Sequence, residues 1–116
     1  MKLGPEDIQS MIFYDWVVFN KLDAFIFHIG NERACSPQAG SILKRKGIKA
    51  GVCDYLVLKP NSLYHGLGIE LKAGKGKTSP AQLEFLQTMR DNGYDGAVCV
   101  GADRAIEHLK SYLQLA

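Results

Sequence analysis

The apolar positions in the first part of the chain predict a helix followed by a short strand. Within residues 5–22, Ile8, Ile12, Trp16 and Phe19 recur every three or four residues, which is the spacing of one side of a helix. We interpret Trp16 and Phe19 as core residues of that side. The aromatic-rich segment 24–29 that follows is typical of a short buried strand.

The rest of the chain alternates strand and helix patterns. Further strands are expected over residues 52–58, 66–72 and 97–100, and further helices over residues 38–46, from residue 80 to a stop at Gly93, and around Ile106, Leu109 and Leu113. Ser79 and Gln82 have the spacing of a capping box, and Asp103 can cap the last helix. This order predicts an α/β fold with a mixed central sheet flanked by helices.

Charged residues interrupt the two central strands at matching places. The turn residues around Ser62 make an antiparallel hairpin the default, and a hairpin centred there pairs Asp54 with Glu70. Because side chains alternate along a strand, Lys72 shares a face with Glu70. The three charged groups are therefore expected on one face, roughly 5 to 8 Å apart.

Two carboxylates at that separation repel each other, and a divalent cation between them removes the repulsion. Oxygen ligands favour Mg²⁺ or Mn²⁺, and either ion can polarise a phosphate and make a bound water more acidic. Lys72 is a candidate to orient the attacking water and offset developing negative charge. The main-chain carbonyl of Leu71 points toward the same region in this arrangement and is a further candidate ligand.

Charge distribution adds to this picture more than overall composition does. The 116 residues suit one domain spanning 1–116, and a net charge of +2 is too small to identify a nucleic-acid binder. The basic residues gather in the middle of the chain, at Arg33, Lys44, Arg45, Lys46, Lys49, Lys72, Lys75 and Lys77. A basic region around the charged strands suits a polyanion, and Lys75 and Lys77 are the nearest candidates for phosphate contacts.

The cysteines and histidines point to no other kind of site. The cysteines are odd in number and match no zinc or redox spacing: Cys35, Cys53 and Cys99. The histidines have no metal-ligand spacing either: His28, His65 and His108. No secretory signal or membrane span is visible, so we expect a cytoplasmic protein with reduced thiols, no membrane partner and no organic cofactor.

Three segments carry a more specific pattern than the spacing of the charges. Residues 47–58 contain Gly-Val-Cys-Asp ending at Asp54, residues 68–72 contain Glu-Leu-Lys, and residues 79–82 read Ser-Pro-Ala-Gln. Together they resemble the VRR-NUC domain, the virus-type replication-repair nuclease branch of the PD-(D/E)XK superfamily. The resemblance runs from Glu6 to about Gly101. Cys53 departs from it, because the family usually has a proline there that shapes the backbone.

The resemblance implies a restriction-endonuclease-like fold and metal-dependent hydrolysis of phosphodiester bonds. It makes Asp54 and Glu70 metal ligands and Lys72 the catalytic lysine. It also implies that Glu6 contributes to the metal site, directly or through water, and that Gln82 matches the family's glutamine after the Glu-x-Lys strand. Stand-alone members of this size, from phages and bacteria, look like dimeric DNA-repair enzymes that cut branched DNA such as Holliday junctions.

Less specific interpretations of these residues stay open. The charged residues of the two strands, Asp54 with Glu70 and Lys72, can form a cross-strand salt bridge on a solvated sheet face, although their apolar flanks argue against this. The role of Glu6 can be limited to a favourable interaction with the helix dipole, and that of Gln82 to capping its helix. The basic side chains can simply be solvated, and these are Lys44, Arg45, Lys46, Lys49, Lys75 and Lys77.

Three further assignments are left open in the same way. Gln9 lies one turn after Glu6 and can face the same site. The last helix, with Tyr112 and Leu113, suits a dimer interface and core packing equally well. As for activity, a less selective flap or duplex nuclease or nickase and a non-catalytic DNA-binding module remain alternatives to a junction-cutting enzyme.

Overall fold

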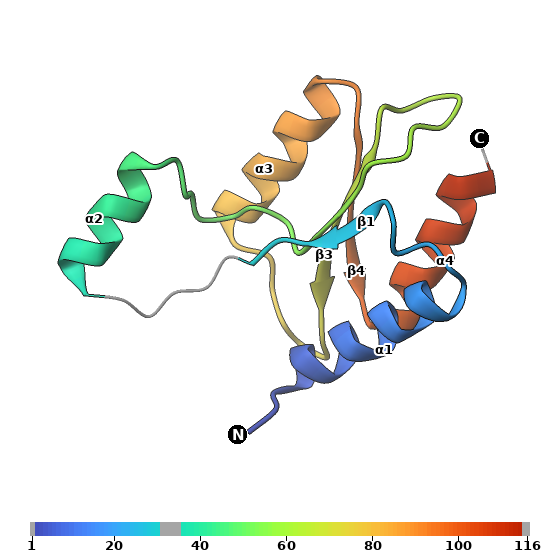
Figure 1. Ribbon diagram of the computed structural model, residues 1–116, viewed down its shortest axis with the longest axis horizontal. Helices are drawn as coiled ribbons and strands as arrows, with labels where there is room; N and C mark the ends of the chain where they lie inside the picture. Colours follow the sequence, from blue (N-terminus) through green and yellow to red (C-terminus); the bar gives the residue numbers. More distant parts are fainter. Residues whose placement is uncertain (1, 31–35, 115–116) are drawn as a thin grey trace.

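A mixed four-stranded sheet with the strand order β1-β2-β3-β4 lies at the centre of the computed structural model, which describes residues 2–30 and 36–114 (Figure 1). The strands are β1 (Ile26–His28), β2 (Tyr55–Val57), β3 (Leu67–Lys72) and β4 (Asp95–Val100), and the helices are α1 (Pro5–Phe19), α2 (Pro37–Arg45), α3 (Pro80–Asp91) and α4 (Ala102–Gln114). This confirms the predicted α/β order, with shorter strands than expected at β1 and β2. Arg33 and Cys35 lie outside the described residues.

Strands β2 and β3 form the antiparallel hairpin predicted from the turn. Tyr55 lies opposite Ile69, and this register places Asp54, the residue before β2, level with Glu70. Strand β4 then returns parallel to β3, with α3 as the crossover connection. The sheet therefore keeps the predicted pairing and adds a parallel neighbour on the other side of β3.

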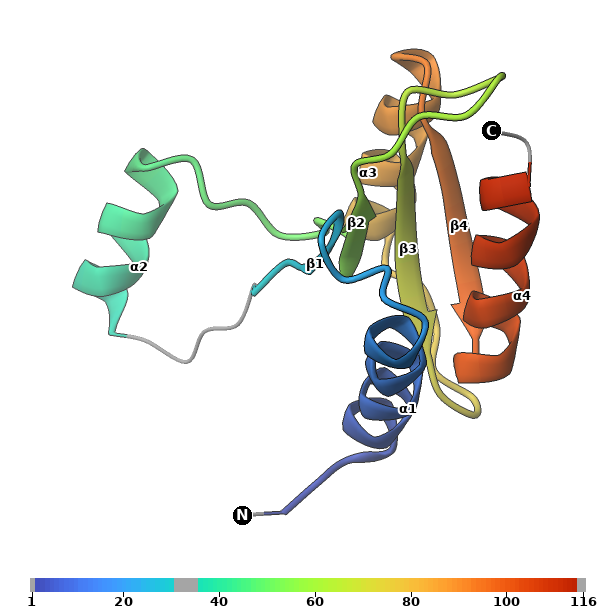
Figure 2. The ribbon, with the colours of Figure 1, turned by 45° about the vertical axis from the view of Figure 1, so that its right-hand side comes forward.

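The two faces of the sheet have different partners, as Figure 2 shows. The side chains of Tyr55, Ile69 and Leu71 join the larger core with α1 and α4. On the opposite face, Gly68 lies so close to α3 that a methyl group there would meet the sulfur of Met89 at 2.5 Å. Because side chains alternate along β3, Glu70 and Lys72 lie on this α3 face.

Helix α1 begins at its N1 proline as predicted but buries a different side from the expected one. Its fully buried residues are Phe13 and Val17. Phe19 is 84% exposed, so its assignment to the core is wrong, while Trp16 is half-buried against the core. The stripe predicted from spacing faces outward because α1 carries apolar residues on both sides, and periodicity alone does not select the inner one.

The start of α4 corrects one further expectation. The helix begins at Ala102, so Asp103 lies in its first turn and is not the cap. The cap comes from α1, where the side-chain oxygen of Gln9 accepts a hydrogen bond of 2.7 Å from the amide of Ala102. Gln9 therefore locks the start of α4 to α1.

The far end of α4 belongs to the core. Tyr112 is 2% exposed, and its hydroxyl donates a 2.7 Å hydrogen bond to the carbonyl of Lys59. Leu113 packs half-buried against the same core. Of the two interpretations of this helix, core packing is the one observed for Tyr112.

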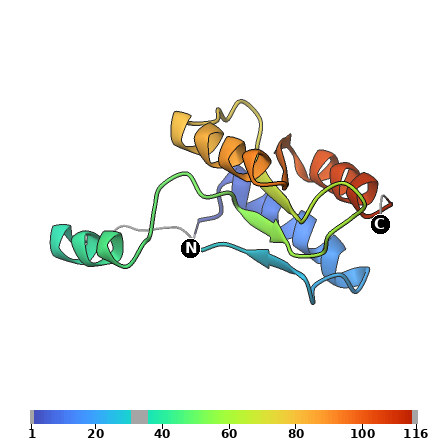
Figure 3. The ribbon, with the colours of Figure 1, turned by 90° about the horizontal axis from the view of Figure 1, so that it is seen from above.

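Helix α2 stands away from the rest of the molecule, as the view from above shows (Figure 3). Ser36 caps it by accepting a 3.1 Å hydrogen bond from the amide of Ala39, and Gly47 follows its end with a φ of 101°. None of its residues is buried, which agrees with the exposed element predicted from its polarity. Among the described helices, none is long and apolar enough to cross a membrane.

Candidate active site

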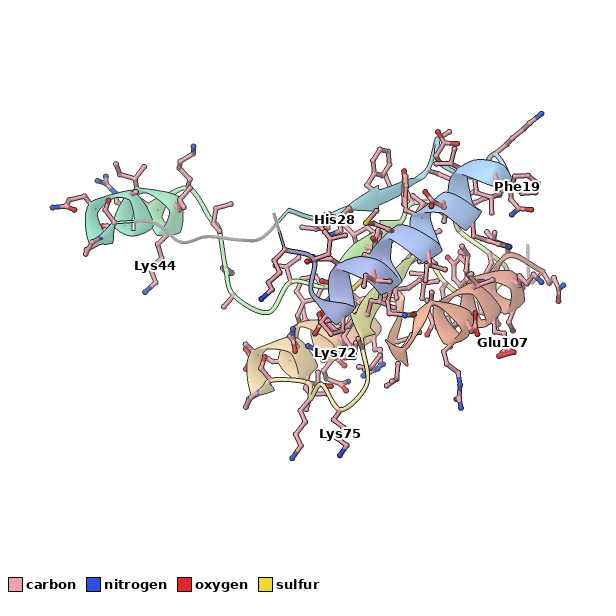
Figure 4. All side chains as sticks on the ribbon, turned by 90° about the horizontal axis from the view of Figure 1, so that it is seen from below. Phe19, His28, Lys44, Lys72, Lys75 and Glu107 are labelled. Atoms are coloured by element: carbon pink, nitrogen blue, oxygen red, sulfur yellow. The ribbon has the colours of Figure 1, made fainter. Side chains whose placement is uncertain are left out.

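Glu70 and Lys72 are buried charged residues on the α3 face of β3. They are 2% and 7% exposed, and Lys72 Nζ lies 3.4 Å from Glu70 Oε2. Figure 4 shows Lys72 where the start of α1, the end of β3 and the start of α3 meet. A salt bridge on a solvated sheet face would be exposed, so the burial of Glu70 and Lys72 contradicts that interpretation of the charged residues.

Asp54 completes the predicted cluster from the neighbouring strand. Its Oδ2 accepts a 2.7 Å hydrogen bond from the amide of Leu71, which holds the carboxylate against β3. The pKa of Glu70 is raised to about 7, mainly by burial and secondly by the negative charge of Asp54. The positive charge of Lys72 offsets part of this increase. The prediction that these three side chains share one face is confirmed, and the two acids repel each other as expected.

Gln82 connects the start of α3 to this cluster. Its Nε2 donates a 2.9 Å hydrogen bond to Glu70 Oε2, and its Oε1 accepts a 2.8 Å hydrogen bond from the amide of Ser79. Ser79 Oγ in turn accepts from the amide of Gln82, so the predicted capping box is present. One side chain therefore caps the start of α3 and orients a buried acid.

The donor set fits a small, hard cation. Glu70 Oε1 is buried and has no hydrogen-bond partner among the described residues, so it presents a free lone pair next to Asp54. The amide of Leu71 points to the Asp54 side, and its carbonyl leaves the strand on that same side. In the described ranges no three His, Cys, Asp or Glu side chains gather as a metal cluster, but Mg²⁺ typically binds one or two carboxylates and keeps several waters.

Glu6 reaches the edge of the same region from the first turn of α1. A methyl group placed on Gly76 would lie 3.6 Å from Glu6 Oε2 and 3.7 Å from Lys72 Cδ, so both side chains border that glycine. Glu6 itself is exposed. The structure thus brings Glu6 near Lys72, with the loop between β3 and α3 beside them.

The basic candidates divide into two groups. Lys75 and Lys77 are exposed on the loop between β3 and α3, next to the acidic cluster. Lys44, by contrast, lies on the outlying α2, away from Lys72 in the body of the molecule (Figure 4). Arg45 is on the same outlying helix, and Lys49 follows it in the chain.

Two neighbours of Asp54 have roles that residue spacing did not reveal. Gly51 has a φ of 91°, and a methyl group there would lie 2.5 Å from the carbonyl oxygen of Ala81, so only glycine lets this loop pass the first turn of α3. The thiol of Cys53 is fully buried and donates to the carbonyl of Tyr55 over 3.3 Å. Burial raises the pKa of Cys53 to about 12, so it is a packed thiol in place of the expected proline.

Comparison with known proteins gives the chain a family. The model of the VRR-NUC domain family matches residues 14–103, which include the Asp54, Glu70, Lys72 and Gln82 positions. The chain belongs to the VRR-NUC family. A solved structure described as a VRR_NUC domain protein is 31% identical, with a TM-score of 0.83 over 100% of this chain and 93% of that one. No curated protein matches.

Membership of the VRR-NUC family makes this a nuclease domain, with DNA as its substrate. The predicted family and the predicted α/β fold are both confirmed. Glu6 precedes the matched residues, and the structure places it beside Gly76 and Lys72.

Proposed function

We propose that this VRR-NUC domain is a Mg²⁺- or Mn²⁺-dependent endonuclease that cuts branched DNA such as Holliday junctions and acts as a homodimer. One observation carries the metal dependence. Glu70 is buried beside a second acid, Asp54, and its Oε1 has no hydrogen-bond partner among the described residues. A buried carboxylate oxygen in that state is costly without a bound cation.

In this proposal Asp54 and Glu70 hold the cation, with the carbonyl of Leu71 as a neutral ligand and Glu6 contributing directly or through water. When bound, the ion supplies Lewis-acid stabilisation of phosphate charge and a more acidic water. The carboxylates of Asp54 and Glu70 are already fixed by hydrogen bonds from Leu71 and Gln82. Little reorganisation of the protein would accompany binding.

Lys72 has the chemical role in this scheme. Its ammonium group lies 3.4 Å from Glu70 Oε2, inside a site where water is largely excluded. A positive charge held there orients the attacking water and offsets the negative charge that develops on the phosphate. The ion pair with Glu70 holds the amine of Lys72 next to the proposed metal ligand.

DNA contacts are proposed for two groups of basic residues, one beside the site and one on the outlying α2 region. Lys75 and Lys77 lie on the exposed loop that follows Lys72, where a phosphate bound at the site would pass. Lys44, Arg45 and Lys49 lie on the outlying α2 region and would reach phosphates farther along the DNA. A domain of 116 residues covers little DNA, so two copies related by a two-fold axis suit two strands of a four-way junction.

A panel of labelled DNA substrates tests the proposed function. We expect cleavage of a synthetic four-way junction in Mg²⁺ or Mn²⁺, no cleavage in a chelator, and a rate at least about tenfold lower on linear duplex of the same sequence. Equal rates on junction, flap and duplex would favour the less selective nuclease. Metal-independent DNA binding with no cleavage of any substrate would favour the non-catalytic module.

Replacing Gln82 separates its two hydrogen-bonding roles. Gln82→Ala is expected to lower metal-dependent cleavage by about tenfold, because Glu70 loses the donor that orients it. It should also reduce stability by about 1 kcal/mol through the cap. The matched control is Ser79→Ala, which removes the cap but leaves the amide beside Glu70 in place. Thermal melts measure the stability of both variants, and single-turnover rates measure their cleavage. Equal losses of activity in the two variants would assign Gln82 to the cap alone.

A further inference from the structure

Helix α1 has an exposed apolar side opposite its buried one. The residues of this side, named here the outer stripe, follow one another at helical spacing: Ile8, Met11, Ile12, Asp15, Val18 and Phe19. Ile8, Ile12, Met11 and Val18 are 45–54% exposed, and Phe19 is 84% exposed. A helix that is apolar on both sides is normally covered on both. The outer stripe therefore has the composition of a surface that another protein element covers.

The charge of α1 restricts what can cover it. The helix carries Glu6, Asp7 and Asp15 and no lysine or arginine. An acidic surface repels the phosphates of DNA and of anionic membranes. The complementary partner is an apolar element with positive charge.

This chain contains such an element, which we name the arm and define as residues 36–49. The arm has no acidic residue, and its basic residues are Lys44, Arg45, Lys46 and Lys49. Ile42 and Ile48 are 58% and 47% exposed, and a hollow of about 300 Å³ is lined by Ile42, Arg45 and Lys46. The arm is therefore basic and apolar where the outer stripe is acidic and apolar.

The arm also lacks support from its own chain. Helix α2 is 9 residues long, has no buried residue, and takes no part in the extensive contacts between the described elements. A helix of that length is marginal in water by itself. Figures 1 and 3 show it held away from the sheet, with its own α1 on the body of the molecule.

We infer that two copies of this chain pair by exchanging arms, the arm of each copy packing on the outer stripe of the other. Each copy offers one arm and one outer stripe, so a two-fold axis pairs both and closes the assembly. Phe19, with its ring projecting at the far end of α1 from Lys72, is the main apolar anchor. The inference deepens the two-copy part of the proposed function and does not depend on metal binding or cleavage.

The mass of the protein in solution tests the exchange, measured by light scattering without DNA or metal. We expect a dimer of about 26 kDa, twice the chain mass of 12.8 kDa. Phe19→Ser on the outer stripe and Ile42→Glu on the arm should each shift the mass toward that of one chain. Leu63→Ser is the matched control, since Leu63 is 67% exposed and lies outside both surfaces. It should leave the dimer unchanged.

A charge exchange distinguishes this pairing from other dimers. Asp15→Lys and Arg45→Glu should each weaken the dimer, and the double variant should recover at least part of the lost affinity. A wild-type protein that stays at the mass of one chain would overturn the inference, and so would a dimer unaffected by Ile42→Glu. If arm variants weaken DNA binding and leave the dimer intact, the arm has only the DNA contacts proposed above, and the exchange is overturned. Loss of cleavage with an intact dimer would contradict the proposed chemistry alone.

Discussion

Lys72→Ala is expected to lower single-turnover cleavage by about 10²–10³-fold while changing DNA affinity by less than about threefold. The side chain of Lys72 is 9% exposed and directed at Glu70, so it contributes little surface for ground-state binding. Its charge is needed mainly when negative charge develops on the phosphate. Affinity is measured in Ca²⁺ by gel shift, and rates are measured in Mg²⁺ with enzyme in excess over labelled junction.

Lys75→Ala is the matched control for Lys72, because it removes the same charge three residues later from an exposed position. It should weaken binding, make binding less dependent on salt, and leave the rate at saturating protein nearly unchanged. Full cleavage by Lys72→Ala would remove the catalytic role assigned to this lysine. Circular dichroism of each variant verifies that the buried substitution leaves the fold intact.

Glu70→Gln is expected to change activity and stability in opposite directions. The variant should lose cleavage and lose the thermal stabilisation that Mn²⁺ gives the wild type, since one ligand charge is gone. In a chelator near pH 8 it should be more stable than the wild type, by on the order of 3 kcal/mol. A neutral amide at this position is no longer repelled by Asp54, and its oxygen can still accept from Gln82.

The pH dependence of stability follows from the sign of the Glu70 shift. Burial and Asp54 raise the pKa of Glu70 from 4.5 to about 7 in the folded state. The stability that the protonated form contributes is complete below pH 4.5 and is lost as the pH rises through 7. The metal-free wild type should therefore lose stability over this range relative to Glu70→Gln. Melts in a chelator across the range measure it.

Glu84→Gln on the exposed side of α3 is the control for the Glu70 prediction, because it makes the same change in charge without burial. It should follow the wild-type melting curve at every pH and keep the response to Mn²⁺. If wild type and Glu70→Gln show the same pH profile without metal, the buried charge does not act as we propose. A Glu70→Gln variant that is still stabilised by Mn²⁺ would place the ion elsewhere.

The sequence was sufficient for those features whose causes lie within a few residues. The capping box at Ser79 and Gln82 depends on hydrogen bonds between residues three apart, so it could be predicted directly. The register of Asp54 and Glu70 follows from the position of the turn and from the two-residue alternation of a strand. For this reason the cluster of Asp54, Glu70 and Lys72 could be predicted from the sequence alone.

Contacts between distant elements needed the tertiary structure. Gln9 caps α4 across 93 positions of the chain, and Gln82 reaches Glu70 from another element. The tertiary structure also determines which side of α1 faces the core. Both sides are apolar, and only packing against the sheet selects Phe13 and Val17. Local hydrogen bonds and side-chain periodicity are encoded in neighbouring residues, whereas the choice between equivalent faces depends on the shapes that meet when the elements pack.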